Sequence, residues 1–160
     1  MQSDLLSLDE AINKIKSNFQ KIGNEDIFLK DALGRCLAKP IISNVDNPKY
    51  DVSSMDGYAI NYKDFSNVRD SKIEKFKIVG ESSAGLPYSK KINSLETVRI
   101  FTGAKLPKGS NTVIIQENVK VSNNGDYIII NESPKKNQFV RKKGLDFKKN
   151  NILFKEGTIL

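Results

Sequence analysis

The segment Asp51–Ala59 gathers side chains that can ligate a metal ion or orient a ligand. It holds two carboxylates, two hydroxyls and a glycine in the order Asp51-Val52-Ser53-Ser54-Met55-Asp56-Gly57-Tyr58-Ala59. In one interpretation Asp56-Gly57 is a turn and a serine caps a helix. In the other, Asp56 is a metal-ligating or ligand-orienting carboxylate, of the kind that suits Mg²⁺, which takes one or two carboxylates from protein and keeps several waters. Spacing alone favours the turn.

A second polar turn, Thr102-Gly103-Ala104, directly follows the apolar run Val98–Phe101. A strand that ends in Thr-Gly places a hydroxyl and free backbone N–H groups at the rim of a sheet, where ligands often bind. A simple change from strand to turn is the commoner explanation. Both interpretations stay open at this point.

Positive charge is concentrated between Lys135 and Lys149. This segment has seven basic residues and one acidic residue, Asp146, so it carries +6 of the chain's formal net charge of +7. Lysine-rich segments are usually solvated surface. The alternative is an anion-binding edge centred on Arg141, because a guanidinium forms two parallel hydrogen bonds with a phosphate or another oxyanion, and Gly144 allows close approach of the backbone.

Composition excludes several classes of site. The chain has no histidine and a single cysteine, Cys36, so it contains no histidine base, no Ser-His-Asp triad, no disulfide framework and no CxxC metal site. Cys36 lies in an apolar-rich run and is expected to be a small buried thiol. Nucleic-acid binding is not favoured, because only one aromatic residue, Phe139, lies near the centre of the basic segment and no known nucleic-acid-binding motif accompanies it.

Two helices are expected in the first 40 residues. Ser7 and Glu10 form a capping-box pattern, and apolar residues recur behind it at helical spacing until Gly23. A short strand is predicted at 27–29 and a second helix from Asp31 to residue 38, before Pro40. Residues 41–42 are expected to be extended.

From about residue 50 the pattern changes to short β-type runs between turn signals. Asn124-Gly125 predicts a hairpin, because a type I′ turn needs positive φ at both central residues. The chain is therefore expected to be α+β, with a β-rich module. The predicted strands are Phe76–Val79, Val98–Phe101, Thr112–Gln116, Val119–Val121 and Tyr127–Ile130.

No apolar run approaches the roughly 20 residues of a membrane span, and the first residues lack the pattern of a signal peptide. A cytoplasmic location without membrane association is expected. The chain ends on the apolar residue Leu160, which suggests that the protein continues beyond it.

Six motifs in a fixed order, spread between Ser7 and Leu160, resemble the N-terminal region of the MoeA family. These proteins are molybdopterin molybdenumtransferases, and they are similar to the E domain of gephyrin. The motifs are Leu33-Gly34-Arg35, Ser53–Ala59, Val98–Ala104, Pro107, Val113–Glu117 and Val140–Asp146.

The resemblance implies insertion of molybdate into adenylated molybdopterin with the help of Mg²⁺, in a homodimer whose active site lies in a cleft between subunits. It implies catalytic roles for Asp56 and Thr102, with Asp56 a possible metal ligand. It further implies a set of substrate-binding residues. They are Ser54, Gly57, Gly103, Arg141 and Asp146.

The sequence departs from the family at two positions and in length. Val52 stands where the family usually has Asn, and Leu145 where it usually has Glu. The molybdopterin-binding domain and the C-terminal β domain are absent, so the isolated chain is expected to be inactive. The implied fold has two lobes: a mixed helical and extended dimerisation lobe, 1–49 with 138–160, and an inserted β-rich lobe, 50–137. A non-catalytic dimerisation or scaffold module is the alternative, followed by a basic polyanion- or nucleic-acid-binding protein.

Overall fold

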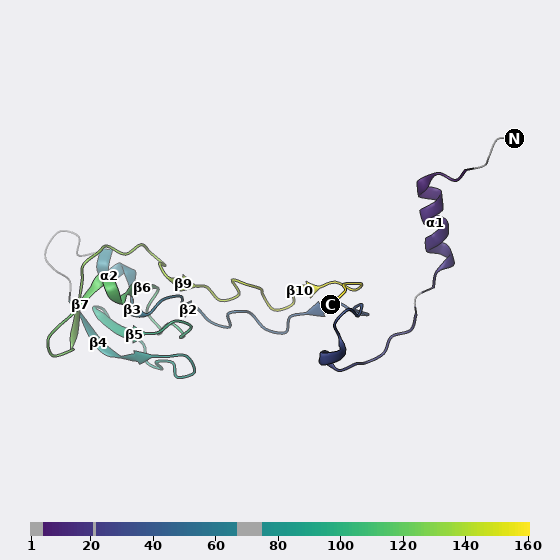
Figure 1. Ribbon diagram of the computed structural model, residues 1–160. Helices are drawn as coiled ribbons and strands as arrows, with labels where there is room; N and C mark the ends of the chain where they lie inside the picture. Colours follow the sequence, from purple (N-terminus) through teal and green to yellow (C-terminus); the bar gives the residue numbers. More distant parts are fainter. Residues whose placement is uncertain (1–4, 21, 67–74) are drawn as a thin grey trace. The chain divides into compact units, whose positions relative to one another are not determined.

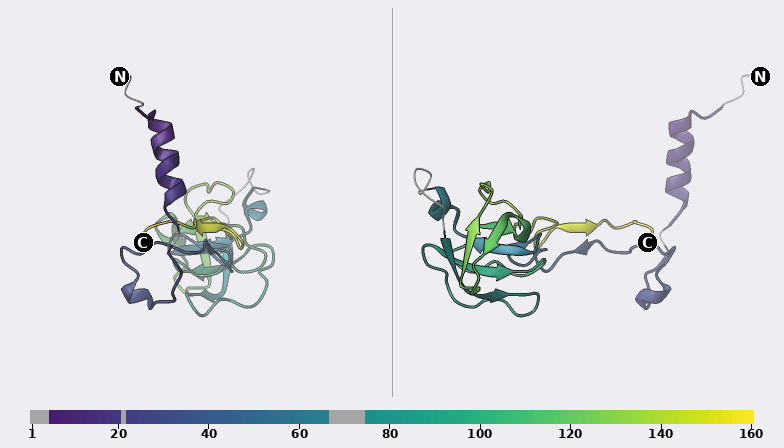
Figure 2. Two further views of the ribbon diagram at one scale, coloured as in Figure 1. Left: turned by 90° about the vertical axis from the view of Figure 1, so that its right-hand side faces the viewer. Right: turned by 60° about the vertical axis from the view of Figure 1, so that its left-hand side comes forward.

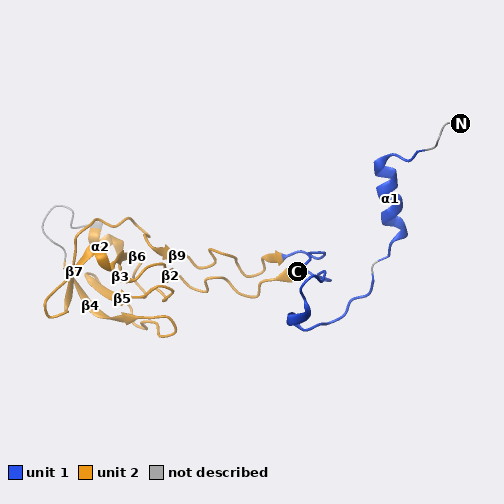
Figure 3. Ribbon diagram, in the orientation of Figure 1, with its two compact units in different colours: residues 1–40, 154–160 blue, residues 41–153 orange. Residues whose placement is uncertain are grey.

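The computed structural model of the chain describes residues 5–20, 22–66 and 75–160, and these fall into two compact units (Figure 3). Unit 1 is Met1–Pro40 with Phe154–Leu160, and unit 2 is Ile41–Leu153. These boundaries differ from those of the expected lobes, 1–49 with 138–160 and 50–137, and that division stays a prediction.

The helix α1, Leu8–Asn18, begins at the predicted capping box. Glu10 accepts a 2.8 Å hydrogen bond from the backbone N–H of Ser7, and the Ser7 hydroxyl accepts one of 3.3 Å from the backbone N–H of Glu10. The helix ends before the expected stop at Gly23. The side chains of Ser17 and Asn18 both donate to the carbonyl of Lys14, which competes with continuation of the backbone ladder.

The remainder of unit 1 has little regular structure. A 3₁₀ turn, η1 (Leu29–Asp31), replaces the strand predicted at 27–29 and the helix predicted from residue 31 to residue 38, so both predictions are wrong. Gly34 at φ +77° turns the chain, and residues 34–37 then exchange backbone hydrogen bonds with 157–160. Cys36 bridges Ile159 in this pairing and is exposed, not buried as predicted, because the paired segments leave its side chain uncovered.

Unit 2 is built on a six-stranded sheet in the order β6-β3-β5-β4-β8-β7 (Figure 1). All neighbours are antiparallel except β4 and β5, which are parallel. The sheet curls, as the two views in Figure 2 show. Its strands are β3 (Gly57–Ile60), β4 (Lys75–Ser82), β5 (Glu96–Ile100), β6 (Thr112–Ile115), β7 (Val119–Val121) and β8 (Tyr127–Ile130).

Strand β3 lies between β5 and β6 and is buried on both faces. Because side chains alternate along a strand, Tyr58 and Ile60 enter one apolar cluster while Ala59 enters the other. The first cluster also contains Phe76, Ile114 and Ile128, and the second contains Ile100, Ala104, Leu106 and Val113. This packing makes β3 the rigid centre of the unit.

The predicted hairpin forms between β7 and β8, which have the predicted bounds. The turn is not type I′, however, since Gly125 has positive φ and Asn124 does not. The N–H of Gly125 donates to the carbonyl of Ser122 at 2.8 Å, so the four-residue turn ends at the glycine.

The remaining elements are short. Two-stranded ribbons form between β1 and β10 and between β2 and β9, and β1 confirms the extended piece expected at 41–42. The chain is thus mostly strands with few helices, and none of the described helices combines the length and apolar character that crossing a membrane requires. The bounds are β1 (Ile41–Ile42), β2 (Val52–Ser53), α2 (Tyr62–Ser66), η2 (Gln116–Asn118), β9 (Val140–Arg141) and β10 (Ile152–Phe154).

Candidate functional site

Asp56 and Thr102 meet at one end of the sheet, although 46 positions separate them in the chain. Strands β3 and β5 are antiparallel, and Gly57 at the start of β3 pairs with Ile100 at the end of β5. The residue before β3 and the turn after β5 therefore lie side by side. The backbone N–H and the hydroxyl of Thr102 both donate to Oδ1 of Asp56, each at 2.8 Å.

These two hydrogen bonds hold Asp56 in its charged form. The backbone N–H of Thr102, then its hydroxyl, and more weakly the charge of Arg99 lower the pKa of Asp56 below its ordinary value. No described group donates a hydrogen bond to Oδ2, the second carboxylate oxygen of Asp56. The site thus presents a fixed carboxylate with one oxygen available to a ligand.

Arg99, which the sequence analysis missed, is held beside this pair. Its guanidinium carbon lies 5.1 Å from the ring centre of Tyr58 and 5.1 Å from that of Phe101, and Nη2 donates to Gln116 at 2.5 Å. Arg99 and Phe101 are two residues apart in the extended run before Thr102, so alternation places them on one face. That alternation was the signal available in the sequence.

Two glycines shape the same end of the sheet. A methyl group at Gly57 would lie 2.0 Å from the carbonyl oxygen of Ile114, so only glycine allows β3 and β6 to approach this closely. Gly103 has φ +79°, which turns the chain immediately after Thr102. Both glycines therefore act through the backbone, and their predicted contact with substrate stays a prediction.

Strand β2 connects this end of the sheet to the basic segment. The N–H of Gly103 donates to the carbonyl of Ser53 at 2.9 Å, and the N–H of Ser54 donates to the carbonyl of Phe139 at 3.0 Å. Next to these contacts, Val52 of β2 pairs with Arg141 of β9. Ser54 thus lies between the two groups of predicted site residues.

The centre of the basic segment is largely paired with carboxylates. Nη2 of Arg141 lies 2.6 and 2.8 Å from the two oxygens of Asp146, which also accepts from the side chain of Asn47 at 3.1 Å. Lys142 and Lys143 are paired with Asp51 and Asp46. The segment is consequently less positive than its composition indicates.

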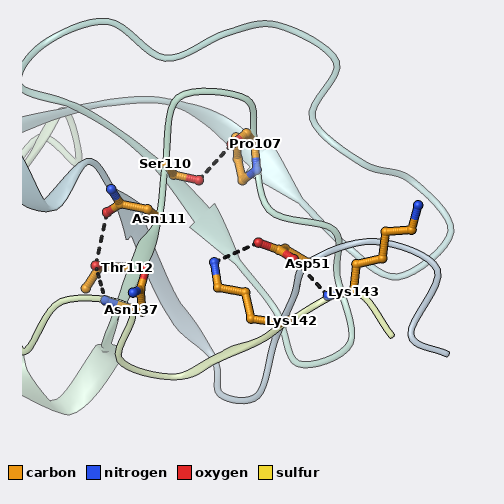
Figure 4. A network of polar contacts seen from close by, with 8 residues as sticks. All are labelled: Asp51, Pro107, Ser110, Asn111, Thr112, Asn137, Lys142 and Lys143. Carbon is orange, nitrogen blue, oxygen red and sulfur yellow. Dashed lines mark hydrogen bonds and ion pairs between the residues drawn. The ribbon is translucent and has the colours of Figure 1, made fainter. Parts of the chain in front are cut away.

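Asp51 is a well-fixed member of this network (Figure 4). Its Oδ2 accepts from Nζ of Lys142 at 2.9 Å, and its Oδ1 accepts from the backbone N–H of Lys143 at 2.8 Å. Partial burial acts to raise the pKa of Asp51, but these hydrogen bonds and the charge of Lys142 outweigh it, and the pKa lies below its ordinary value. The carboxylate thereby fixes β2 to the loop after β9.

Asp46 is held in a similar way. The backbone N–H of Lys149 and the ammonium of Lys143 lower its pKa, against a smaller opposing effect of burial. The basic loop is thus attached to the segment before β2 at three carboxylates. They are Asp46 and Asp51, which accept from the loop, and Asp146 of the loop, which accepts from Asn47.

Comparison with known proteins decides the family. The chain matches the family model described as the MoeA N-terminal region (domain I and II) over residues 6–160. This chain belongs to the MoeA family. The structure is similar to that of the molybdopterin biosynthesis MoeA protein from Pyrococcus horikoshii, with a TM-score of 0.85 and 31% identity, covering 98% of this chain and 41% of that one.

Curated MoeA relatives agree with this assignment. The molybdopterin molybdenumtransferase of Haemophilus influenzae is 35% identical over 157 residues, which are 98% of this chain and 37% of the relative. That of Nostoc is 36% identical over 136 residues, 85% of this chain and 31% of the relative. The chain therefore spans about a third of the length of these relatives.

The site offers few protein ligands to a metal ion. Within the described ranges, no three carboxylate or cysteine side chains converge closely enough to hold one. Asp56 still fits Mg²⁺, because this ion commonly takes one or two protein carboxylates and completes its shell with water and substrate phosphates.

Proposed function

We propose that this chain is the N-terminal part of a molybdopterin molybdenumtransferase, the enzyme that inserts molybdate into adenylated molybdopterin. One observation carries the proposal: Thr102 fixes Asp56 through two hydrogen bonds at the position where the family motifs M-D-G-Y-A and T-G-A meet. Family membership supports the reaction class, which belongs to molybdenum-cofactor biosynthesis. The substrates follow from the family and from the positive charge near the site.

The mechanism that fits these residues is electrostatic. Molybdate and the phosphates of an adenylated pterin are anions, and charge that builds up during displacement is stabilised by fixed donors and cations. The available groups are the guanidiniums of Arg99 and Arg141, which keep N–H donors beyond those used in their contacts with Gln116 and Asp146. Ser54 and Asp146 would help to orient the substrate, Ser54 with its hydroxyl and Asp146 by holding Arg141.

Asp56 would hold Mg²⁺ through its available oxygen, Oδ2. When bound, Mg²⁺ supplies positive charge to phosphate and molybdate oxygens. The contribution of Thr102 is to keep Oδ1 occupied and the carboxylate ionised, since a protonated Asp56 would be a poor ligand. Thr102 therefore positions the carboxylate rather than reacting itself.

The partner proposed for this chain is a second copy of the same protein. Apolar side chains of α1 and of the residue that follows it are exposed in the single chain, among them Leu8, Ile15 and Phe19. An exposed apolar face of this kind marks an interaction surface. It supports dimerisation through α1. The division into a dimerisation lobe, 1–49 with 138–160, and an inserted lobe, 50–137, and a cytoplasmic location are further parts of the proposal.

The same exposed face supports a second candidate, a scaffold module that dimerises without catalysis. The two candidates differ at Asp56. A scaffold does not need this carboxylate, whereas the transferase does. Because the chain spans about a third of its relatives, we propose that it is inactive alone and needs the molybdopterin-binding domain.

The proposal is tested with a joined protein, in which these 160 residues are followed by the molybdopterin-binding domain and the remaining part of a MoeA relative. Adenylated molybdopterin, Mg²⁺ and molybdate are supplied, and release of AMP and molybdenum bound to the pterin are measured. The transferase proposal predicts both products, and only when molybdate is present. A folded, dimeric protein that releases neither product would leave the scaffold as the better account.

A further inference from the structure

Strand β2 has a cationic residue on each side of Val52. On one side Val52 pairs antiparallel with Arg141 of β9, and on the other it forms an antiparallel bridge with Lys105. Residues directly opposite one another in antiparallel strands project from the same face. Lys105, Val52 and Arg141 therefore form a row across one face, with the outer two backbones roughly 10 Å apart, twice the interstrand spacing of about 4.8 Å.

The contacts of the opposite face confirm this orientation. Asp51 directly precedes Val52, and Lys142 directly follows Arg141, so the side chains of Asp51 and Lys142 project to the other face. They form a 2.9 Å ion pair with each other there (Figure 4). The ion pair of Asp51 thus leaves the charges of the row unaffected.

Lys105 is held in place without being neutralised. Its Nζ lies 4.1 Å from the ring centre of Tyr50, which lies in the bend just before β2. In the described part of the chain Lys105 forms no ion pair with a carboxylate. Contact with the ring of Tyr50 fixes the ammonium and keeps its positive charge.

Arg141 also retains binding capacity. Its ion pair with Asp146 uses Nη2 alone, and a guanidinium has five N–H donors. Val52, between the two cations, is small and carries no donor or acceptor in its side chain. The face therefore offers a cation on each side of a short apolar surface.

We propose that Lys105 and Arg141, with Tyr50 as a positioning residue, form a binding site for a tetrahedral dianion across Val52. The shared chemistry is that of a phosphate monoester or molybdate. The identity of the biological ligand rests on the proposed function. Within that function, Lys105 would help to hold a substrate anion. Because the side chain of Val52 supplies no hydrogen bond, the anion is held by charge alone at that point.

The test uses the 160-residue chain and three probes: AMP, inorganic phosphate and molybdate. Affinity is measured by calorimetry, and amide chemical shifts show where each probe binds. Binding is expected to shift the amides of Val52 and Lys105. K105Q should weaken binding about tenfold, the size expected for loss of a charge-assisted hydrogen bond, and Y50L should weaken it less. Stronger binding of AMP or of molybdate identifies the source of the anion.

The matched control is K108Q, which removes an exposed lysine three residues away and outside the row. It should leave affinity unchanged. Equal affinity in K105Q and the unsubstituted chain, or an equal loss in K108Q, overturns the site, as does binding that leaves the amides of Val52 and Lys105 unshifted. If the 160-residue chain binds the anion at the row, but the protein that joins it to the remaining domains of a MoeA relative folds and does not insert molybdate, the site is upheld and the proposed function is contradicted.

Discussion

Thr102 donates two hydrogen bonds to a single oxygen of Asp56, one from its backbone N–H and one from its hydroxyl, each 2.8 Å long. The contact joins the turn after β5 to the bend before β3, and it forms because Gly57 and Ile100 are paired in the sheet. The pair is thus positioned by the most buried strand of the unit.

The first prediction concerns the hydroxyl of Thr102. T102V removes that donor but keeps the backbone N–H, so the pKa of Asp56 should rise toward its ordinary value while remaining below it. The carboxylate is titrated by NMR. T102S is the matched control, since it retains both donors and should leave the pKa unchanged; an equal shift in T102S would contradict the role of the hydroxyl.

The second prediction is a loss of stability in acid. Asp46, Asp51 and Asp56 have folded pKa values below their ordinary value of 3.8. Their contribution is therefore fully present well above pH 3.8 and is lost as the pH falls through the lowered folded values. The unfolding temperature should be nearly constant between about pH 7 and about pH 5, and it should decrease once the pH is lower than about 4.

The double variant D46N/D51N tests this cause. Asparagine cannot ionise, so the variant should be less stable at pH 7 and should lose less further stability in acid. A variant whose unfolding temperature falls with pH as steeply as that of the unsubstituted chain would show that other groups are responsible.

The third prediction compares two glycines. G57A places a methyl group 2.0 Å from a backbone oxygen of β6, and the strands must separate, which should cost about 3 kcal/mol or more. G103A meets no atom within 4 Å and should cost only about 1 kcal/mol, from its positive φ. Urea unfolding measures both. Equal costs would mean that β3 and β6 are not packed as closely as described.

The fourth prediction separates stability from function at Arg141. Its ion pair with Asp146 is exposed and should contribute less than about 1 kcal/mol to stability. The R141Q substitution is made in the joined protein, in which these 160 residues are joined to the remaining domains of a MoeA relative. It should leave the unfolding temperature almost unchanged but slow molybdate insertion at least about tenfold. K136Q, an exposed lysine with no described partner, is the control. A loss of stability that matches the loss of activity would assign Arg141 a structural role.

Local patterns in the sequence were sufficient for some elements. The capping box of Ser7 and Glu10 defines the start of α1, and alternation with turn residues defines β7 and β8. Each of these depends on interactions between residues that are close in the chain. The same reasoning failed at 31–38, where pairing with 157–160 competes with a helix.

Other features depend on contacts across long separations. Strand β3 was missed because Asp56-Gly57 looks like a turn, and its extended form is stabilised by β5 and β6. The charge of the basic segment was predicted, but its pairing with Asp46 and Asp51 was not, since about 90 residues or more separate the partners. Thr102 was singled out from its motif, and its contact with Asp56 required the register of the sheet.

The central claim is that the Asp56 carboxylate acts in molybdate insertion, and D56N in the joined protein tests it most directly. Asparagine keeps the size of the side chain and can still accept from Thr102, so the fold and dimer should persist. The account predicts that insertion of molybdate and release of AMP are abolished while the oligomeric state and unfolding temperature remain close to those of the unsubstituted protein. Insertion at the unsubstituted rate by a D56N protein would contradict the account.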